Sequence, residues 1–315
     1  MSQHVLRSAG EEQIKPNYSG RIASWDRFGP GYNTEPPATL NESVTTAGFR
    51  IEPGTAYGFF TDTTVCIGCK ACEVGCKEWN QIPMDDLGFK ATSYDNTAEL
   101  RATTWRHVTF MEDFHRDGRP NRWLFMSDVC KHCEQAGCLE ACPTGAIVRT
   151  EFGSVLIQQD VCNGCKYCVG ACPFGVITVD EEQDNTAHKC TFCYDRLKAG
   201  IEPACAKACP TDSILFGPVM ELRKIARKRV EELHARGIRE AYLYGVPGGP
   251  GATGGIGSLN CFFLLTERPE AYNLPPAPEL PSRRAAQGLL AAAATALAYG
   301  AATILAVRSA RAGRR

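Results

Sequence analysis

The stretch CIGCKACEVGCKEWN, from Cys66 to Asn80, decides the fold of this chain. Two, two and three residues separate its four cysteines, and a lysine follows the last of them. Three further groups repeat the pattern: the first widens the middle spacing to four residues, the next keeps the original spacing, and the last widens it to eleven. A proline follows the final cysteine of each further group. The four groups in chain order are Cys66, Cys69, Cys72 and Cys76; Cys130, Cys133, Cys138 and Cys142; Cys162, Cys165, Cys168 and Cys172; and Cys190, Cys193, Cys205 and Cys209.

The composition restricts the reason for so many cysteines. A chain of 315 residues has room for about two domains with apolar cores, so its 17 cysteines do not compensate for small size. The first residues, MSQHVLRSAG, contain no apolar run of the kind that secretion signals have. The net charge of −1 gives no large basic surface, which argues against a nucleic-acid partner. The composition therefore indicates bound metal.

The spacing of the cysteines indicates which metal group they bind. Zinc requires four thiolates around a single ion, and three cysteines within seven residues overcrowd that arrangement. One tight loop can reach three irons of a 4Fe-4S cubane, while the fourth cysteine serves a second cluster, as in the CxxCxxCxxxCP run of bacterial ferredoxins. We therefore predict four 4Fe-4S clusters, which carry electrons. Zinc and, after it, disulfides are the alternatives.

Motifs for catalysis by the chain itself are missing from the sequence. Neither a P-loop nor a GxSxG elbow occurs. The glycines Gly249, Gly251 and Gly254 match GxGxxG, but the strand-like segment CFFLLTERPE follows them instead of a helix. We interpret this segment as a turn and the chain as non-catalytic.

Segments outside the cysteine groups have simpler patterns. Residues 1–55 read as an extended arm, either a disordered tail or an arm that a partner orders. Apolar residues three and four apart predict an amphipathic helix over residues 218–236, which Gly237 ends. Residues 285–307 carry no charge and are long enough to cross a bilayer; a soluble helix is the alternative. Short strands are expected at WRHVTFMED, NRWLFMSD, SVLIQ and GVITV.

Several residues near the motifs have two interpretations each. His132 is expected in a loop at the surface or an interface, with cluster tuning or proton relay as the alternative. Cys261, distant in sequence from the other cysteines, is expected to be a small buried hydrophobe. Trp79 and Tyr167 are expected to pack against the cluster loops. Three loop lysines either stabilise the anionic clusters or are simply exposed: Lys70, Lys131 and Lys166.

The four motifs closely resemble those of the iron-sulfur (beta) subunits of membrane-bound respiratory formate dehydrogenases. The resemblance runs from about residue 59 to the end, through WLFMSDVCKHCEQAGCLEACPTGAI, CNGCKYCVGACPFGV and HKCTFCYDRLKAGIEPACAKACPTDSILFG. The cysteines alone would fit the equivalent subunit of another respiratory oxidoreductase or a hydrogenase. CKEWN and the C-terminal layout narrow the resemblance to formate dehydrogenase. A zinc-stabilised scaffold is the alternative from another class.

The resemblance implies that the first group shares its clusters with the fourth group, and the second group with the third. The implied ligand sets are Cys66, Cys69, Cys72 and Cys209 for cluster 1; Cys76, Cys190, Cys193 and Cys205 for cluster 2; Cys130, Cys133, Cys138 and Cys172 for cluster 3; and Cys142, Cys162, Cys165 and Cys168 for cluster 4. The implied fold is α+β, with two ferredoxin-like double-cluster modules related by an internal repeat and a C-terminal transmembrane helix.

The implied domain boundaries follow from these sets. Residues 56–125 and 180–217 form the first module, and residues 126–179 form the second. Residues 218–282 contain the amphipathic helix, the Gly-rich turn and a strand, and residues 283–315 contain the transmembrane helix with a basic tail.

The resemblance also implies partners. These are a catalytic alpha subunit that oxidises formate at a molybdenum or tungsten pterin centre, and a membrane cytochrome b gamma subunit that passes electrons to quinone. Four arginines follow the apolar segment and two precede it directly, which favours a cytoplasmic C terminus and an extracytoplasmic cluster domain. Export would then depend on a partner's signal.

Overall fold

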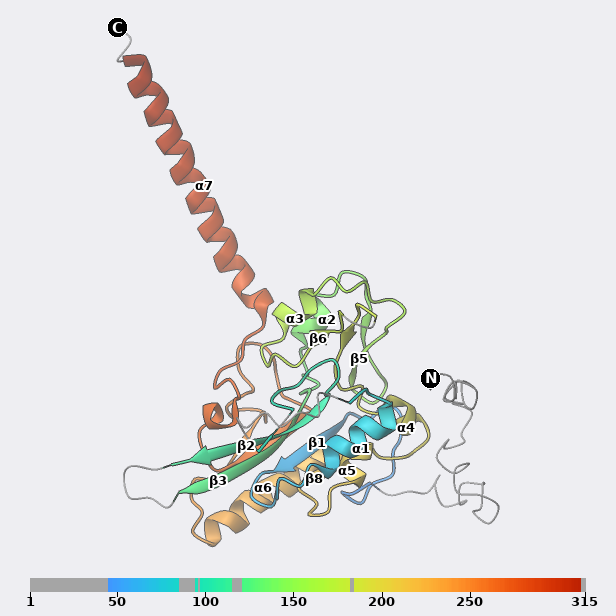
Figure 1. Cartoon of the computed structure of the whole chain (residues 1–315). Helices are drawn as coiled ribbons and strands as arrows, with labels where there is room; N and C mark the ends of the chain where they lie inside the picture. The colour runs from blue at the N-terminus through green and yellow to red at the C-terminus, as the bar shows by residue number, and fades with distance from the viewer. Residues whose placement is uncertain (1–44, 85–93, 96, 115–120, 182–183, 313–315) are drawn as a thin grey trace, which may run out of the picture.

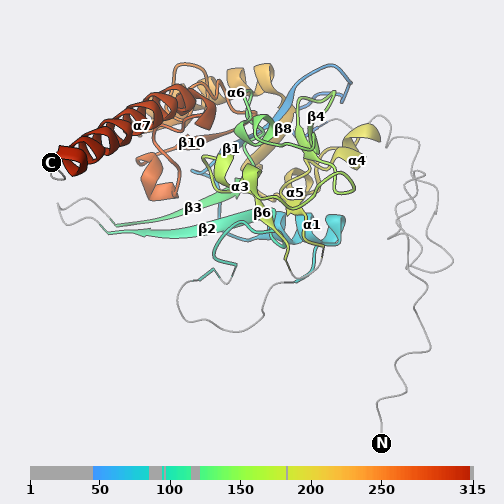
Figure 2. The same cartoon turned by 90° about the horizontal axis from the view of Figure 1, so that it is seen from above.

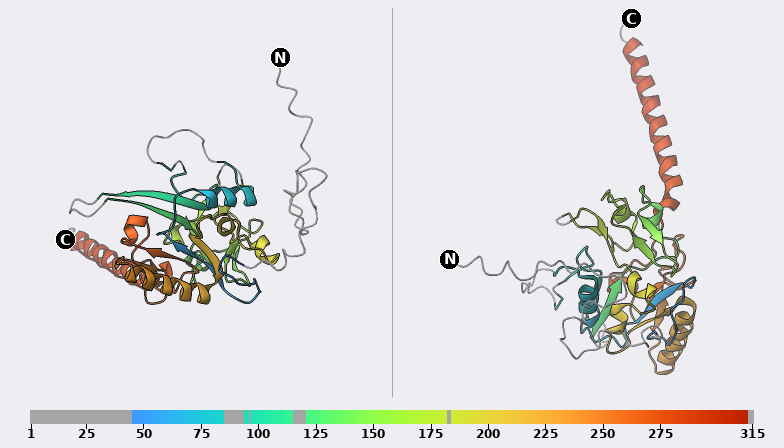
Figure 3. Two further views of the ribbon diagram at one scale, coloured as in Figure 1. Left: turned by 90° about the horizontal axis from the view of Figure 1, so that it is seen from below. Right: turned by 90° about the vertical axis from the view of Figure 1, so that its right-hand side faces the viewer.

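The computed structural model describes residues 45–84, 94–95, 97–114, 121–181 and 184–312. The predicted arm therefore lies mostly outside the described residues. The rest combines helices with short strands, which agrees with the α+β prediction. A helix projects from this body in Figure 1 and in the right-hand view of Figure 3.

A four-stranded sheet connects distant parts of the chain. Its order is β8 (Ile214–Pro218), β1 (Tyr57–Asp62), β10 (Cys261–Leu265) and β9 (Tyr242–Tyr244). Strand β1 runs antiparallel to β8 and parallel to β10, and all of its residues are buried. Helix α6 (Val219–Ala235) packs on this sheet through Leu222, Ala226 and Leu233. The sheet thus holds the segments before and after the cysteine groups together.

The remaining strands form three antiparallel pairs. The long hairpin pairs β2 (Arg106–Asp113) with β3 (Arg122–Val129), and Figure 2 shows it along one side of the body. Shorter pairs join β4 (Ile147–Arg149) to β5 (Val155–Ile157), and β6 (Thr178–Val179) to β7 (Ala187–His188). All four strands expected from the sequence are present, although most are shorter than the apolar patterns suggested.

Short helices begin inside the cysteine groups, and the proline after the last cysteine explains their lengths. Helices α2 (Gly137–Glu140), α3 (Tyr167–Ala171) and α5 (Ala204–Lys207) all end before a Cys-Pro pair, while α4 (Tyr194–Lys198) follows Cys193. In the first group a lysine replaces proline, and α1 (Ala71–Asn80) continues through it. Proline would remove a helical N–H donor at that position. Lys77 therefore permits the longer helix that carries CKEWN.

The C-terminal third follows the sequence-based expectations. Helix α6 matches the amphipathic pattern, and Gly237, with a φ of 91°, follows its end. No helix starts among the described residues between β9 and β10, so the GxGxxG segment lacks the context of a nucleotide site. A 3-10 turn, η3 (Pro269–Tyr272), precedes α7 (Pro281–Ala312). Within α7, the segment Gly288–Ser309 is long and apolar enough to cross a membrane, and it is not buried against the rest of the described structure.

Candidate functional site: four cysteine-lined cavities

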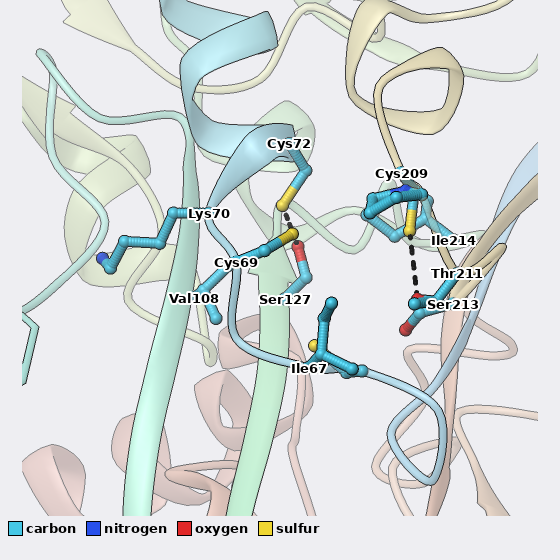
Figure 4. Close-up of a pocket in the computed structure, with 12 residues that line it drawn as sticks. Ile67, Cys69, Lys70, Cys72, Val108, Ser127, Cys209, Thr211, Ser213 and Ile214 are labelled. Carbon is cyan, nitrogen blue, oxygen red and sulfur yellow. Dashed lines mark hydrogen bonds between the residues drawn. The ribbon is translucent and has the colours of Figure 1, made fainter.

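The first cavity brings two distant cysteine groups together. Cys66, Cys69, Cys72 and Cys209 line it, and we call it site 1. The pairing of β1 with β8 explains the meeting, because Asp62 N–H donates to Ser213 O at 2.8 Å and so aligns the loops that extend beyond both strands. Figure 4 shows Cys69, Cys72 and Cys209 around this space, with the Ser127 hydroxyl 3.2 Å from the Cys72 Sγ.

Helices α1 and α5 form the second cavity, site 2, which Cys76, Cys190, Cys193 and Cys205 line. The two helices lie side by side in Figure 2, and they pack closely at Gly75, where an added Cβ would lie 3.1 Å from the Cβ of Ala208 at the end of α5. The Asn80 side chain donates to the Cys76 carbonyl at 2.8 Å and lies 3.7 Å from its sulfur. The last residue of CKEWN is therefore a neighbour of site 2.

The other two cavities lie around α2 and α3. Cys130, Cys133, Cys138 and Cys172 line site 3, and Cys142, Cys162, Cys165 and Cys168 line site 4. The helices pack closely, since an added Cβ on Gly137 would lie 2.6 Å from the Ala171 carbonyl oxygen. The structure thus places the sixteen cysteines around four cavities, in the same four sets that the resemblance implied.

Contacts between neighbouring sites give the order of the first three. Helix α1 carries Cys72 of site 1 and Cys76 of site 2, and the ring of Phe192 at site 2 lies 4.6 Å from that of His132 at site 3. Electrostatic interactions between the cysteines agree with this order. Burial raises the pKa of Cys72 in site 1 to about 12, and the Cys205 thiolate of site 2 adds to this rise. Burial likewise raises the pKa of Cys190 in site 2 to about 12, and Cys130 of site 3 contributes. Site 2 therefore lies between sites 1 and 3.

The same argument places site 4 after site 3. Burial raises the pKa of Cys138 to about 12, and one of the thiolates that add to it is Cys168 of site 4. Both terminal sites have an exposed cysteine, Cys69 in site 1 and Cys165 in site 4. The four sites form a row whose two ends reach the surface.

The spacing of the sulfurs distinguishes a cluster from a single ion. Four sulfurs at about 2.3 Å from a tetrahedral zinc lie roughly 3.8 Å apart. Within the described residues, the one group of three ligand-type side chains whose donor atoms all lie within 4.8 Å of one another is Glu73, Asp95 and His107, without any cysteine. The sulfurs of each site are thus too widely spread for one ion, whereas a 4Fe-4S cluster accepts four thiolates at separate irons. All 17 cysteines are free, as ligands must be.

The group formed by Glu73, Asp95 and His107 is already paired with a lysine side chain, that of Lys70. The Lys70 ammonium lies 3.0 Å from Glu73 Oε1 and 2.6 Å from Asp95 Oδ1. Burial opposes ionisation of Asp95, but His107, Lys70 and Thr97 outweigh it and hold the pKa of this carboxyl well below its usual range. Figure 4 shows Lys70 directed away from the sulfurs of site 1. Lys70 therefore stabilises the fold beside the cluster loop.

The other candidates have mixed outcomes. The expectation that His132 lies at the surface was wrong: the side chain is fully buried, lines site 3 and accepts a hydrogen bond from the Val155 N–H at 3.0 Å. Lys131 is also buried beside site 3, whereas Lys166 is exposed. Tyr167 was expected to pack against a cluster loop but is 66% exposed.

Trp79 and Cys261 agree better with expectation. The indole of Trp79 donates to Asp195 at 2.8 Å, and the Arg196 guanidinium lies 4.1 Å from its ring centroid, so it joins α1 to α4. Cys261 is buried as predicted. Although distant in sequence, it lies close enough to Cys190 and Cys130 to interact with both, and burial followed by these thiolates raises its pKa.

Three residues near the sites escaped the sequence analysis: Ser127, Arg106 and Lys189. Ser127 lies on β3 at site 1, and Arg106 begins β2 and lines site 2. Lys189 immediately precedes Cys190 and is buried. A strand residue outside any motif, such as Ser127 or Arg106, gives no sequence signal of a nearby site. Lys189 did give such a signal, because it directly precedes the predicted ligand Cys190.

Comparisons with known proteins identify the bound group. Two family models, both described as 4Fe-4S dicluster domains, match residues 65–146 and 121–219. The formate dehydrogenase iron-sulfur subunit of Haemophilus influenzae is 42% identical over 223 residues, 70% of this chain and 68% of the relative. The nitrate-inducible formate dehydrogenase iron-sulfur subunit of Escherichia coli is also 42% identical, over 70% of this chain and 72% of the relative. The B subunit of the anaerobic dimethyl sulfoxide reductase of Escherichia coli is 36% identical over 54% of this chain and 77% of the relative. The prediction of 4Fe-4S clusters is confirmed.

Proposed function

The chain belongs to the family of formate dehydrogenase iron-sulfur subunits, and from that premise we propose how it conducts electrons between a catalytic subunit and the membrane. A bound 4Fe-4S cluster takes up and releases one electron at a time. Four such clusters in a row form a conductor. The observation that carries the proposal is the row of four cysteine sites with both ends at the surface.

Each site would hold one cluster through the four cysteines that line it. Cys66, Cys69, Cys72 and Cys209 would bind cluster 1, and Cys76, Cys190, Cys193 and Cys205 cluster 2. Cys130, Cys133, Cys138 and Cys172 would bind cluster 3, and Cys142, Cys162, Cys165 and Cys168 cluster 4. In the first and third groups, repeated backbone conformations support two related modules: Gly68 and Gly164 both have a φ of 67°, and Lys70 and Lys166 have φ values of 59° and 64°. Residues 56–125 with 180–217, and residues 126–179, would be these modules.

The position of α7 suggests the direction of electron flow. Ser282 in the first turn of α7 donates to Glu140 of α2 at 2.8 Å, and Figure 1 shows α2 and α3 beside the base of α7. Sites 3 and 4 therefore lie on the side of the body from which this helix projects. Electrons would enter at site 1, from a molybdopterin alpha subunit that oxidises formate, and leave from site 4 to a cytochrome b gamma subunit and quinone.

The exposed α7 would anchor the chain in the bilayer through residues 285–307. The arginine distribution favours a cytoplasmic C terminus with the cluster domain on the other side. Reporter fusions at the C terminus test this orientation. Activity of a cytoplasmic reporter is expected, and activity restricted to a reporter that works only in the periplasm would refute it.

Purification of the intact complex through this chain tests the function. The expected preparation contains a molybdopterin subunit and a cytochrome b, reduces a dye on addition of formate, and carries about sixteen irons on this chain. A catalytic partner without formate activity would instead favour another respiratory oxidoreductase, for which the similarity to the dimethyl sulfoxide reductase B subunit is the supporting observation. Several zincs with no EPR signal after reduction would contradict both functions.

A further inference from the structure

Arg106 is a buried cation whose hydrogen bonds are incomplete. Its side chain is 1% exposed and lies 4.7 Å from the ring centroid of Phe59. Nη1 donates to the Ser127 hydroxyl at 3.0 Å, but Nε and Nη2 have no hydrogen-bond partner among the described residues. Burial of a charge with unmade hydrogen bonds is costly unless an opposite charge lies nearby. The site therefore requires negative charge close to Arg106.

The surroundings of Arg106 belong to two cysteine sites. Arg106 lines site 2, and the hydroxyl that it contacts, that of Ser127, also contacts the Cys72 sulfur of site 1. Burial alone would lower the pKa of Arg106, yet attraction to Cys205, Cys72 and the other nearby thiolates outweighs it and raises the pKa. Arg106 thus interacts with cysteines of sites 1 and 2.

Lys189 occupies the equivalent position one site further along the row. It is 3% exposed, and its ammonium donates to the Cys190 carbonyl at 3.1 Å and to the Val155 carbonyl. Cys190 lines site 2, and Val155 lines site 3. The lysine therefore lies against the wall between sites 2 and 3.

Site 4 differs from sites 2 and 3 in this respect. The charged side chain in its described lining is Lys166, which is 54% exposed and paired with Glu181. Water screens an exposed charge far more than a buried one. Site 4 thus has no buried cation within its described lining.

We propose that Arg106 and Lys189 are fixed positive charges that raise the reduction potentials of the clusters on either side of each. Arg106 acts on clusters 1 and 2, and Lys189 acts on clusters 2 and 3. Reduction adds one electron and therefore one negative charge to a cluster, which a buried cation stabilises. Cluster 2, between both cations, is stabilised most in its reduced form. This inference rests on the four clusters of the proposed function.

Redox titration followed by EPR on the purified intact complex tests the inference through two variants. Arg106→Met and Lys189→Met each remove one charge and retain apolar volume. Each variant is expected to lower the reduction potentials of two of the four clusters. The potential of one cluster, cluster 2, is expected to fall in both variants. The expected shift is at least a tenfold fall in the ratio of reduced to oxidised cluster at a given potential, or about 59 mV for one electron.

Charge-retaining variants and a surface control separate electrostatics from packing. Arg106→Lys and Lys189→Arg are expected to keep most of the original potentials. Lys224→Met removes the same charge from an exposed side chain on α6 and is expected to shift no couple. The inference is overturned if all four couples move together, if none moves, or if the charge-retaining variants shift the couples as far as methionine does.

The result stays interpretable when a variant loses iron. If Arg106→Met fails to assemble, Lys189→Met decides by the same criterion of two shifted couples beside two unshifted ones. A wild-type complex without four couples contradicts the proposed function itself, whereas four couples that ignore both substitutions contradict only this inference.

Discussion

The two buried cysteines of helix α1 line different sites, which leads to a sharp prediction for Cys76→Ser. Cys72 and Cys76 are both buried on the same helix, one turn apart, yet Cys72 lines site 1 and Cys76 lines site 2. A self-contained four-cysteine motif would put both sulfurs on one cluster. The row of sites predicts instead that the substitution affects cluster 2, whose other cysteines lie more than a hundred residues further along the chain.

The size of the effect follows from the ligand count. Serine offers a harder oxygen donor in place of one of four thiolates, so cluster 2 loses between one iron and all of its irons. The iron content should fall from about sixteen per chain by roughly one to four. The cluster 2 signal in the EPR spectrum of the reduced protein should change or vanish, while the cluster 1 signal remains.

Cys72→Ser is the matched control, since it alters the same helix one turn earlier. It should disturb cluster 1 and leave cluster 2 nearer to intact. The reasoning is refuted if Cys76→Ser removes the cluster 1 signal and preserves that of cluster 2. Equal loss of both signals in both variants would show that α1 merely needs to be folded.

Two further substitutions and one truncation test the surroundings. Lys77→Pro should cost about 3 kcal/mol of folding free energy by breaking α1, which chemical denaturation measures against Lys77→Ala; an unchanged midpoint would contradict the role given to this lysine. Asp95→Asn should destabilise the protein at neutral pH. Because the folded pKa of Asp95 is depressed, its contribution is present above the unfolded pKa of about 3.9 and is lost as the pH falls through the folded value. The difference in thermal midpoint from wild type should therefore shrink below about pH 4, and a constant difference would exclude the ionic origin. A stop codon at Gly288 removes the apolar part of α7 and should release the chain from the membrane fraction with its iron retained; continued sedimentation with membranes would mean that partners anchor it.

Short-range spacing explains why the sequence alone could indicate the candidate cysteines. A CxxCxxC loop and the cysteine three residues after it are local features, so their chemistry can be inferred without knowing the fold. The amphipathic pattern of α6 and the uncharged length of α7 are equally local. The partnership of the first group with the fourth is not local, because it depends on β1 pairing with β8. Only the family resemblance supplied that partnership in advance.

Charge and burial were harder to predict because they depend on neighbours from other segments. His132, between two cysteines in a polar stretch, looked like a surface residue, yet Phe192 packs 4.6 Å from its ring centroid and buries it. Arg106 begins a strand whose pattern gives no reason to bury a guanidinium. In both cases the deciding contacts include residues far away along the chain, such as Phe192 and Cys205, which periodicity does not reveal.

The buried charges and the buried cysteines explain each other. Sulfurs such as Cys72 and Cys190 resist ionisation when isolated in the core, as their raised pKa values show. Arg106 and Lys189 would be just as costly to bury among neutral thiols. A bound cluster would remove both penalties, since Cys72 and Cys190 would be held deprotonated as iron ligands and the anionic cluster would supply the negative charge that Arg106 and Lys189 need. The contacts of Arg106 and Lys189 with the cysteine sites would therefore have two effects. They would raise the reduction potentials of the clusters, and they would make the stability of the folded core depend on bound clusters.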